Sequence, residues 1–258
     1  MKRATATTSA TQRTAWAGSW GGKTTVVGLT LEACRIRNTL ADGVNLCSGS
    51  SGCVVRDCHF RNTGDDSLAA WSPKAGGPPD NNNTLEGNFI QLPWLANGIA
   101  IYGGGTCKVV GNTIHDTVTT GSGILIAANF DAWPLQAEVT VQGNRLVRCG
   151  AHESDQGGPT GALRVLAFDS DLSAGRIRFL DNEVIAPLES AVSIHGPRIA
   201  GSLSFERLLV TGLTSGGPLL DVRPGAAGSV QFTNMASDLS VPGLWRNLAG
   251  ADFVVTRP

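Results

Sequence analysis

The sequence predicts a right-handed parallel β-helix of about eight rungs, and three observations lead to this all-β fold class. Short runs of alternating apolar residues recur at intervals of 24 to 38 residues. Glycine is frequent, with 33 residues in 258, and charged residues make up only 16% of the chain. Each repeat is too short to bury its own apolar face, so neighbouring repeats must stack to share one core.

The repeat is clearest in six segments in which two alternating runs flank a small or polar pair. When the segments are aligned on the central position, they give a column of Cys34, Cys58, Asn88, Asn112, Asn144 and Asn182. In a coil of stacked strands, such a column is a row of neighbours about 4.8 Å apart. Four asparagines in a row predict an internal ladder in which each amide bonds to the next. The two cysteines could form a disulfide, but buried free thiols are favoured.

A second column lies downstream, where each following short strand begins. Each member is a polar residue, a small residue and then an apolar residue, and the polar residues are Asp42, Asp66, Asn97, Ser122, Thr160 and Ser190. This alignment makes Asp42 and Asp66 neighbours in consecutive rungs, about 5 Å apart. Leucine-rich repeats are excluded because no leucine ladder recurs. Propeller blades need about 40 residues or more, and the shortest repeats here have 24.

Longer connections interrupt the rhythm and are predicted to be loops that protrude and wall a binding cleft. They are residues 73–82, 128–137, 150–160 and 167–174. Residues 1–14 are rich in threonine and are predicted to be a disordered leader, because they lack the apolar run of a secretory signal peptide. Residues 15–258 are predicted to be a single β-helix domain, which could be the C-terminal part of a longer catalytic β-helix.

Charge and hydropathy argue against several kinds of partner. A net charge of −1 gives no reason to expect nucleic acid or an anionic membrane. The chain has no apolar run of about 18 residues that could span a membrane. Its six cysteines include no CxxC pair typical of zinc or redox sites. We therefore expect a monomer without a cofactor or a resident metal.

The strongest functional signal is the group of carboxylates at Asp42, Asp65 and Asp66. Asp65 precedes Asp66 at a predicted turn, where both side chains can point outward. Like charges this close raise at least one pKa, which keeps one carboxyl group protonated beside an ionised one. Hydrolysis of a glycosidic bond requires such a pair. Two alternatives stay open, because aspartate-rich strings also form turns and bind calcium.

Three strings, LADGVNL, FRNTGDDSLAAWS and IQLPWLANGIAIYGG, closely resemble glycoside hydrolase family 87, which holds the α-1,3-glucanases and mycodextranases. The resemblance runs from about Thr25 to at least Gly196. It implies an inverting β-helical hydrolase that acts on an extracellular α-glucan, either α-1,3-glucan or nigeran. It also implies that the catalytic aspartates lie in the DG-x-N and GDD strings, which here are Asp42, Asp65 and Asp66.

The substrate class implied by this resemblance is a neutral glucan rather than a uronate. Polygalacturonases form a related β-helical group with a similar spacing of aspartates, and they carry Gly-His-Gly followed by a basic string. The corresponding stretch of this chain reads Asn97-Gly98-Ile99, and no such basic string follows.

Further residues near these strings are predicted to bind the substrate. Aromatic faces can stack on sugar rings, although core packing is an equal alternative for each aromatic residue. Asn45 matches the DG-x-N string and could orient Asp42 or a sugar hydroxyl group. His152 could reach the cleft from the 150–160 loop. The predicted substrate-binding residues are Asn45, Trp71, Trp94, Asn97, Tyr102 and His152.

Two other classes of function carry the same repeats. One is a non-catalytic β-helical module that binds glycan or mediates assembly. The other is a lyase or epimerase, which would need Arg or Lys beside the acids when it acts on uronates, whereas the basic residues here are scattered. Only one partial rung, residues 22–39, precedes Asp42. We therefore expect activity to depend on an upstream region.

Overall fold

The computed structural model of the chain describes residues 2–4, 15–17, 25–117, 119–153, 158–169, 171–199, 202–213, 217–238 and 244–257. Of the predicted leader, only Lys2–Ala4 falls within these residues, where it forms a strand, and the rest lies outside them. No helix in the described ranges has the length and apolar character needed to cross a membrane.

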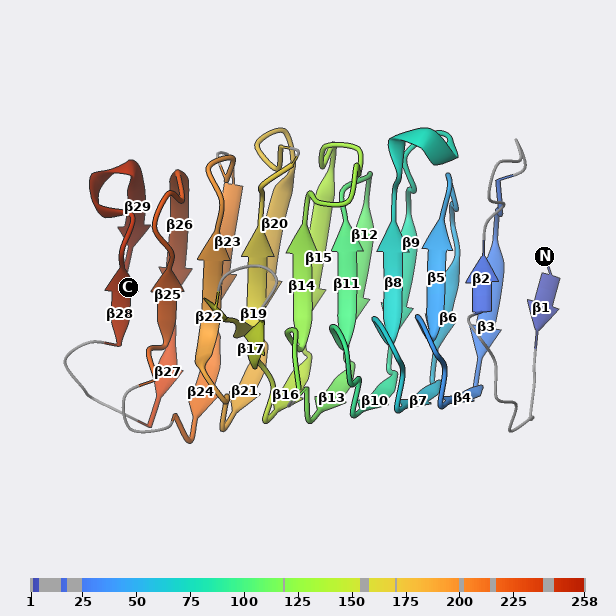
Figure 1. Ribbon diagram of the computed structural model, residues 1–258, viewed down its shortest axis with the longest axis horizontal. Coiled ribbons are helices and arrows are strands. Elements are labelled where there is room, and N and C mark those ends of the chain that lie inside the picture. The colour runs from blue at the N-terminus through green and yellow to red at the C-terminus, as the bar shows by residue number, and fades with distance from the viewer. Residues whose placement is uncertain are drawn as a thin grey trace.

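The strands stack into three parallel sheets that run along the length of one coil (Figure 1). The first sheet consists of β1 (Lys2–Ala4), β3 (Leu29–Glu32), β6 (Val54–Arg56), β9 (Asn83–Glu86), β12 (Cys107–Val110), β15 (Glu138–Gln142), β20 (Arg176–Leu180), β23 (Ser202–Glu206), β26 (Gly228–Thr233) and β29 (Phe253–Thr256). The second sheet consists of β4 (Arg35–Arg37), β7 (His59–Arg61), β10 (Phe89–Gln91), β13 (Thr113–His115), β16 (Arg145–Val147), β21 (Glu183–Ile185), β24 (Leu209–Thr211) and β27 (Ala236–Ser237).

The third sheet carries the candidate site. It consists of β2 (Ala15–Ala17), β5 (Val44–Cys47), β8 (Leu68–Trp71), β11 (Ile99–Tyr102), β14 (Ile124–Ala127), β19 (Gly161–Leu166), β22 (Ser190–His195), β25 (Leu220–Val222) and β28 (Trp245–Asn247). Each turn of the coil contributes one strand to each sheet, so the eight strands of the second sheet correspond to about eight turns. The predicted parallel β-helix is confirmed.

The predicted asparagine ladder is also confirmed. Asn88 donates from Nδ2 to Oδ1 of Asn112 at 3.0 Å, Asn112 donates to Asn144 at 2.9 Å, and Asn144 donates to Asn182 at 3.0 Å. Each of these Oδ1 atoms also accepts the backbone N–H of the preceding asparagine in the ladder. At the start of the column, Cys34 and Cys58 are buried free thiols, and the Cys34 N–H donates to Sγ of Cys58 at 3.4 Å.

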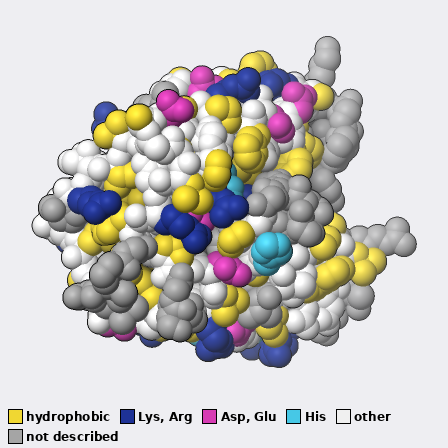
Figure 2. All heavy atoms as spheres, turned by 60° about the vertical axis from the view of Figure 1, so that its left-hand side comes forward, with side chains coloured by type: hydrophobic (Ala, Val, Ile, Leu, Met, Phe, Trp, Pro, Cys, Tyr) yellow, Lys and Arg dark blue, Asp and Glu magenta, His cyan; other side chains and the backbone are white. Residues whose placement is uncertain are grey.

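Apolar side chains from all three sheets fill the inside of the coil. Among them, Phe179, Phe205 and Phe232 occupy matching positions in successive rungs, with ring centroids 4.3 and 4.8 Å apart. Trp245 meets Phe232 edge-on at 4.8 Å near the C-terminal end of this stack. On the outer surface, Figure 2 shows Lys and Arg side chains interspersed with acidic and apolar ones.

The predicted register of the third sheet is correct for four rungs and wrong by one residue at the fifth. Val44, Leu68, Ile99 and Ile124 pair in succession. Ile124 then pairs with Leu163, however, and not with Ala162 as the column predicted. The reason is that Thr160 closes the base of the 150–160 loop, where its Oγ1 donates to the backbone oxygen of Ala151 in that loop and to that of Gly121 in the preceding rung. The residue that continues the column is therefore Leu163, one residue later than predicted.

The four predicted loops connect strands as expected. The 73–82 loop contains the short 3-10 helix η1 (Lys74–Gly76), and the 150–160 loop contains the antiparallel hairpin of β17 (His152–Glu153) and β18 (Gly158–Pro159). A second 3-10 helix, η2 (Gly250–Asp252), precedes β29. The 73–82 and 128–137 loops bind each other through an antiparallel bridge between Pro73 and Ala132. They form a joint wall beside β8 and β11.

Candidate active site

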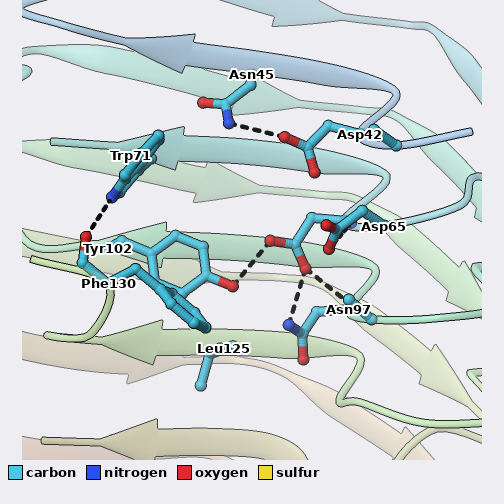
Figure 3. Close-up of a pocket in the computed structure, with 11 residues that line it drawn as sticks. Asp42, Asn45, Asp65, Trp71, Asn97, Tyr102, Leu125 and Phe130 are labelled. Carbon is cyan, nitrogen blue, oxygen red and sulfur yellow. Dashed lines mark hydrogen bonds between the residues drawn. The ribbon is translucent and has the colours of Figure 1, made fainter. Parts of the chain in front are cut away.

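Asp42, Asp65 and Asp66 meet at the edge of the third sheet where β5 and β8 begin (Figure 3). The backbone N–H of Gly43 donates to the carbonyl oxygen of Asp66 at 2.9 Å, which locks the two turns together. One carboxylate oxygen from each aspartate lies within 4.8 Å of the other two. All three side chains line an open pocket of about 340 Å³.

The Asp66 carboxyl group is held from both sides. Its Oδ1 accepts the backbone N–H of Asn97 at 2.9 Å and the Nδ2 of the same residue at 2.8 Å. Its Oδ2 accepts the hydroxyl group of Tyr102 at 2.8 Å. Asp66 is only 3% exposed, so these bonds fix its orientation within the wall of the pocket.

The other two carboxyl groups are held by fewer bonds. Asp42, which is 9% exposed, accepts a hydrogen bond from Nδ2 of Asn45 on its Oδ2 at 2.7 Å. Asp65 is half-buried and accepts the backbone N–H of Asp66 on its Oδ1 at 2.9 Å.

Burial and mutual repulsion separate the pKa values of the aspartates. Burial, followed by the charges of Asp42 and Asp65, raises the pKa of Asp66 to about 8, against the opposing bonds from Asn97. Burial, followed by the charge of Asp65, raises the pKa of Asp42 to about 6, while Asn45 lowers it. Burial also raises the pKa of Asp65. Near pH 7 the site therefore combines a protonated carboxyl group with an ionised one, as acid–base catalysis requires.

The opposite side of the pocket is apolar. Trp71, Tyr102, Leu125 and Phe130 line it, and the first two are the last residues of β8 and β11. The Tyr102 and Phe130 rings meet edge to face with centroids 5.4 Å apart. The indole Nε1 of Trp71 donates to the backbone oxygen of Phe130 at 3.2 Å. An acidic half and an aromatic half thus face one another across one cavity (Figure 3).

Seven of the nine predicted site residues line this pocket, and they are Asp42, Asn45, Asp65, Asp66, Trp71, Asn97 and Tyr102. The other two, Trp94 and His152, are exposed and are not among the lining residues. Sequence reasoning missed the other four of the eleven lining residues, which are Ala41, Ala96, Leu125 and Phe130. The signal for Phe130 was an aromatic residue inside a loop already predicted to wall a cleft. Leu125 gave no signal, because an apolar residue on a strand normally indicates core.

The cluster of aspartates is also the place where a cation could bind, since three carboxylate oxygens converge there. Calcium takes six to eight oxygen ligands, so three carboxylates and the nearby Asn45 amide would have to be completed by water or by sugar hydroxyl groups. No step of the chemistry below requires this ion.

A parallel β-helix with an outward cluster of aspartates facing aromatic residues is an arrangement suited to binding and hydrolysing carbohydrate. A family model described as "Alpha-1,3-glucanase catalytic domain D2" matches residues 17–156, which is more than half of the chain and includes all three aspartates. The chain belongs to this family of α-1,3-glucanase catalytic domains, glycoside hydrolase family 87. A search of curated proteins found no match.

Solved structures agree with this assignment. The catalytic unit of a thermostable family 87 α-1,3-glucanase from Streptomyces thermodiastaticus strain HF3-3 is 35% identical, with a TM-score of 0.79 over 89% of this chain and 43% of that one. The Agl-KA catalytic domain is 28% identical, with a TM-score of 0.83 over 96% of this chain and 45% of that one.

A third structure, a family 87 α-1,3-glucanase catalytic domain in complex with tetrasaccharides, is 22% identical and supports the fold alone. Its TM-score is 0.74 over 90% of this chain and 48% of that one. The chain therefore spans less than half the length of each of these three structures.

Proposed function

We propose that this protein is a glycoside hydrolase that cleaves α-1,3-glucosidic bonds in α-1,3-glucan or nigeran with inversion of configuration. The observation that carries the proposal is the convergence of three carboxyl groups with separated pKa values in one open pocket of a family 87 β-helix. Family membership supports the linkage and the inversion. The spacing of the carboxylates does not, because inverting enzymes usually hold these groups about 6.5–9.5 Å apart.

In this mechanism Asp66 is the general acid and Asp42 is the general base. Asp66 keeps its proton at neutral pH and donates it to the glycosidic oxygen as the bond from that oxygen to the anomeric carbon breaks. Asp42 is ionised above about pH 6 and takes a proton from the water that attacks the anomeric carbon from the opposite face. Asp65 adds a second negative charge that can orient this water.

The remaining parts of the proposal follow from this chemistry. Side chains and water suffice for the reaction, so it uses no cofactor. The substrate is a polymer that does not enter cells, so the protein is proposed to act outside the cell. Residues 15–258 are proposed to be one β-helix domain that acts as a monomer. A family 87 α-1,3-glucanase catalytic domain has been solved in complex with nigerose, an α-1,3-linked disaccharide, which supports this class of substrate.

A non-catalytic glycan-binding module is the second candidate. The observation that favours it is the aromatic half of the pocket, where Trp71, Tyr102 and Phe130 offer ring surface to a sugar independently of any catalysis. Such a module would retain the aromatic half of the pocket and bind oligosaccharides without cleaving them.

Reducing-end release from α-1,3-glucan and from nigeran separates the two candidates. We expect release by the wild-type chain and a loss of about 100-fold or more in Asp66→Asn, the range for removal of a general acid. Asp57→Asn is the matched control, because Asp57 is an exposed turn residue outside the pocket. Undiminished release by Asp66→Asn, or no release by the wild type from either glucan, contradicts the hydrolase proposal.

A further inference from the structure

Phe130 projects from the 128–137 loop into the aromatic half of the pocket (Figure 3). The side chain is 55% exposed, so its ring lines the cavity without being covered by it. A single exposed phenylalanine on a protein surface is common and does not by itself indicate a binding site. The unusual feature of Phe130 is its backbone conformation.

The backbone at Phe130 is held in a conformation that phenylalanine rarely adopts. Phe130 has a φ of 57° and Asp131 has a φ of 52°, so two consecutive residues with full side chains lie in the left-handed region. A bulky residue with positive φ is an outlier that persists only where its surroundings hold it, and such residues cluster at ligand sites.

Side chains and backbone from two other rungs hold this conformation. The Phe130 N–H donates to Oδ2 of Asp169 at 3.0 Å, and its carbonyl oxygen accepts Nε1 of Trp71 at 3.2 Å. At the next residue, the Lys74 N–H donates to the Asp131 carbonyl oxygen at 3.0 Å, and the Lys74 Nζ lies 3.4 Å from the Asp131 carboxylate. Both backbone polar groups of Phe130 are therefore engaged, and the direction of its ring is determined by its neighbours.

The residues that line the pocket indicate which kind of ligand would pack on the Phe130 ring. None of the eleven described residues that line the pocket is Lys or Arg, so nothing there would pair with an anionic sugar. A neutral pyranose has an apolar face of C–H groups and a rim of hydroxyl groups. The aromatic half can pack against that face, while Asp42, Asn45 and Asp65 accept or donate hydrogen bonds at the rim.

We infer that Phe130 is the platform for a neutral glucosyl unit next to the bond that the aspartates cleave, and that Asp169 is a positioning residue that aims it. This inference rests on the proposed function for the identity of the sugar. It adds a substrate-binding residue and a remote anchor that the sequence did not predict.

Binding of an α-1,3-linked glucose tetrasaccharide, measured by calorimetry in the Asp66→Asn background to prevent cleavage, tests the platform. We expect Phe130→Ala to raise the Kd at least tenfold and Phe130→Tyr to retain most of the affinity. The melting temperature should stay within a few degrees, because the ring is more than half exposed. Phe168→Ala is the matched control. This residue is 44% exposed on the neighbouring loop and does not line the pocket, so its Kd should stay within twofold.

A double-mutant cycle tests the anchor. Asp169→Ala should weaken binding of the tetrasaccharide when Phe130 is present and have no further effect when Phe130 is alanine, because it acts only through the ring. Additive effects of the two changes would overturn the positioning role. Equal affinities of the parent and Phe130→Ala, or no binding by the parent, would overturn the platform.

Hydrolysis of α-1,3-glucan by the wild-type chain is measured separately, so failure of the platform and failure of the hydrolase remain distinguishable. If the glucan is cleaved but Phe130→Ala binds normally, only the platform fails. If binding depends on Phe130 but no glucan is cleaved, only the hydrolase fails.

Discussion

Tyr102 lines the pocket as the sequence predicted and makes a further contact that the sequence did not indicate. The sequence left sugar stacking and core packing open for its ring, and the structure adds that its hydroxyl group donates to Asp66 at 2.8 Å from a buried position. Burial and the adjacent carboxylates raise the pKa of Tyr102 well above its ordinary value. The hydroxyl group therefore remains a donor at any working pH, and a donor favours the ionised form of its acceptor.

The pH profile of kcat/KM should be bell-shaped, since hydrolysis needs Asp42 ionised and Asp66 protonated. We expect half-maximal rates near pH 6 and pH 8, the values to which burial and repulsion raise the pKa of Asp42 and of Asp66. Because Asp42 and Asp66 titrate as a coupled pair, the apparent pKa of each limb is a property of the pair and not of one residue. Activity that keeps rising above pH 9 would contradict the assignment of Asp66 as the acid.

Tyr102→Phe should move the alkaline limb of that profile upward. The change removes a donor to the Asp66 carboxylate, which disfavours the ionised form and raises its pKa further. Asn45→Ala should move the acid limb upward for the same reason at Asp42. Full pH profiles of the two variants and the wild type measure both shifts. If Tyr102 only packed in the pocket wall, the alkaline limb of the Tyr102→Phe profile would coincide with that of the wild type.

Asp80 is a buried carboxyl group outside the pocket, and we expect it to make stability depend on pH. Burial raises its pKa to about 7, while backbone N–H groups of Ser50 and Gly49 and the Ser72 hydroxyl group only partly offset that rise. Neither carboxylate oxygen has a hydrogen bond of good geometry. A folded-state pKa above the unfolded value means stability that is complete below about pH 4 and is lost as the pH rises to about 7.

Asp80→Asn removes this titration. The variant should therefore be more stable than the wild type at pH 8, by at most about 4 kcal/mol at roughly 1.4 kcal/mol per pKa unit. The difference should shrink toward zero at pH 4. Urea unfolding at both pH values measures it, and a variant that is less stable than the wild type at pH 8 would show that the Asp80 charge is well compensated.

Structural elements that repeat at regular intervals along the sequence were predictable, and the irregular loops between them were not. The asparagine column occupies four consecutive rungs, from Asn88 to Asn182, so pattern alone located the ladder. The slip at Thr160 arose because its side chain serves the base of a loop. The direction of Phe130 depends on two left-handed residues and on Asp169 and Trp71 from other rungs. Local sequence carries no trace of such long-range contacts.

The ladder should account for a measurable part of the stability of each rung. Asn112→Ala would remove the acceptor for two donors of Asn88 and the donor to Leu85 and Asn144. Each buried polar group left unpaired costs about 1–3 kcal/mol, so we expect a total loss of about 3–5 kcal/mol. Lys108→Ala, an exposed position on the adjacent β12, should change stability by less than about 0.5 kcal/mol. Equal effects of the two variants in thermal or urea unfolding would contradict a structural role for the ladder.

At the scale of the whole molecule, each rung contacts mainly its two neighbours, as the linear strand orders of the three sheets show (Figure 1). Stability in such a coil is close to a sum of terms for single rungs and for the interfaces between them. The pocket draws on residues of β5, β8, β11 and β14 and on the turns that flank these strands. A ligand bound there should therefore stabilise a few rungs and not the entire coil.

Hydrogen exchange in the presence of an α-1,3-linked glucose tetrasaccharide tests this locality. With the Asp66→Asn variant, we expect slower exchange in β5, β8, β11 and β14 and in the 128–137 loop, and unchanged exchange in β25, β28 and β29. The reason is that local opening near the C-terminal end breaks interfaces that the ligand does not touch. Equal protection along all rungs would mean that the coil opens as one cooperative unit. In that case the stability of the site could not be argued rung by rung.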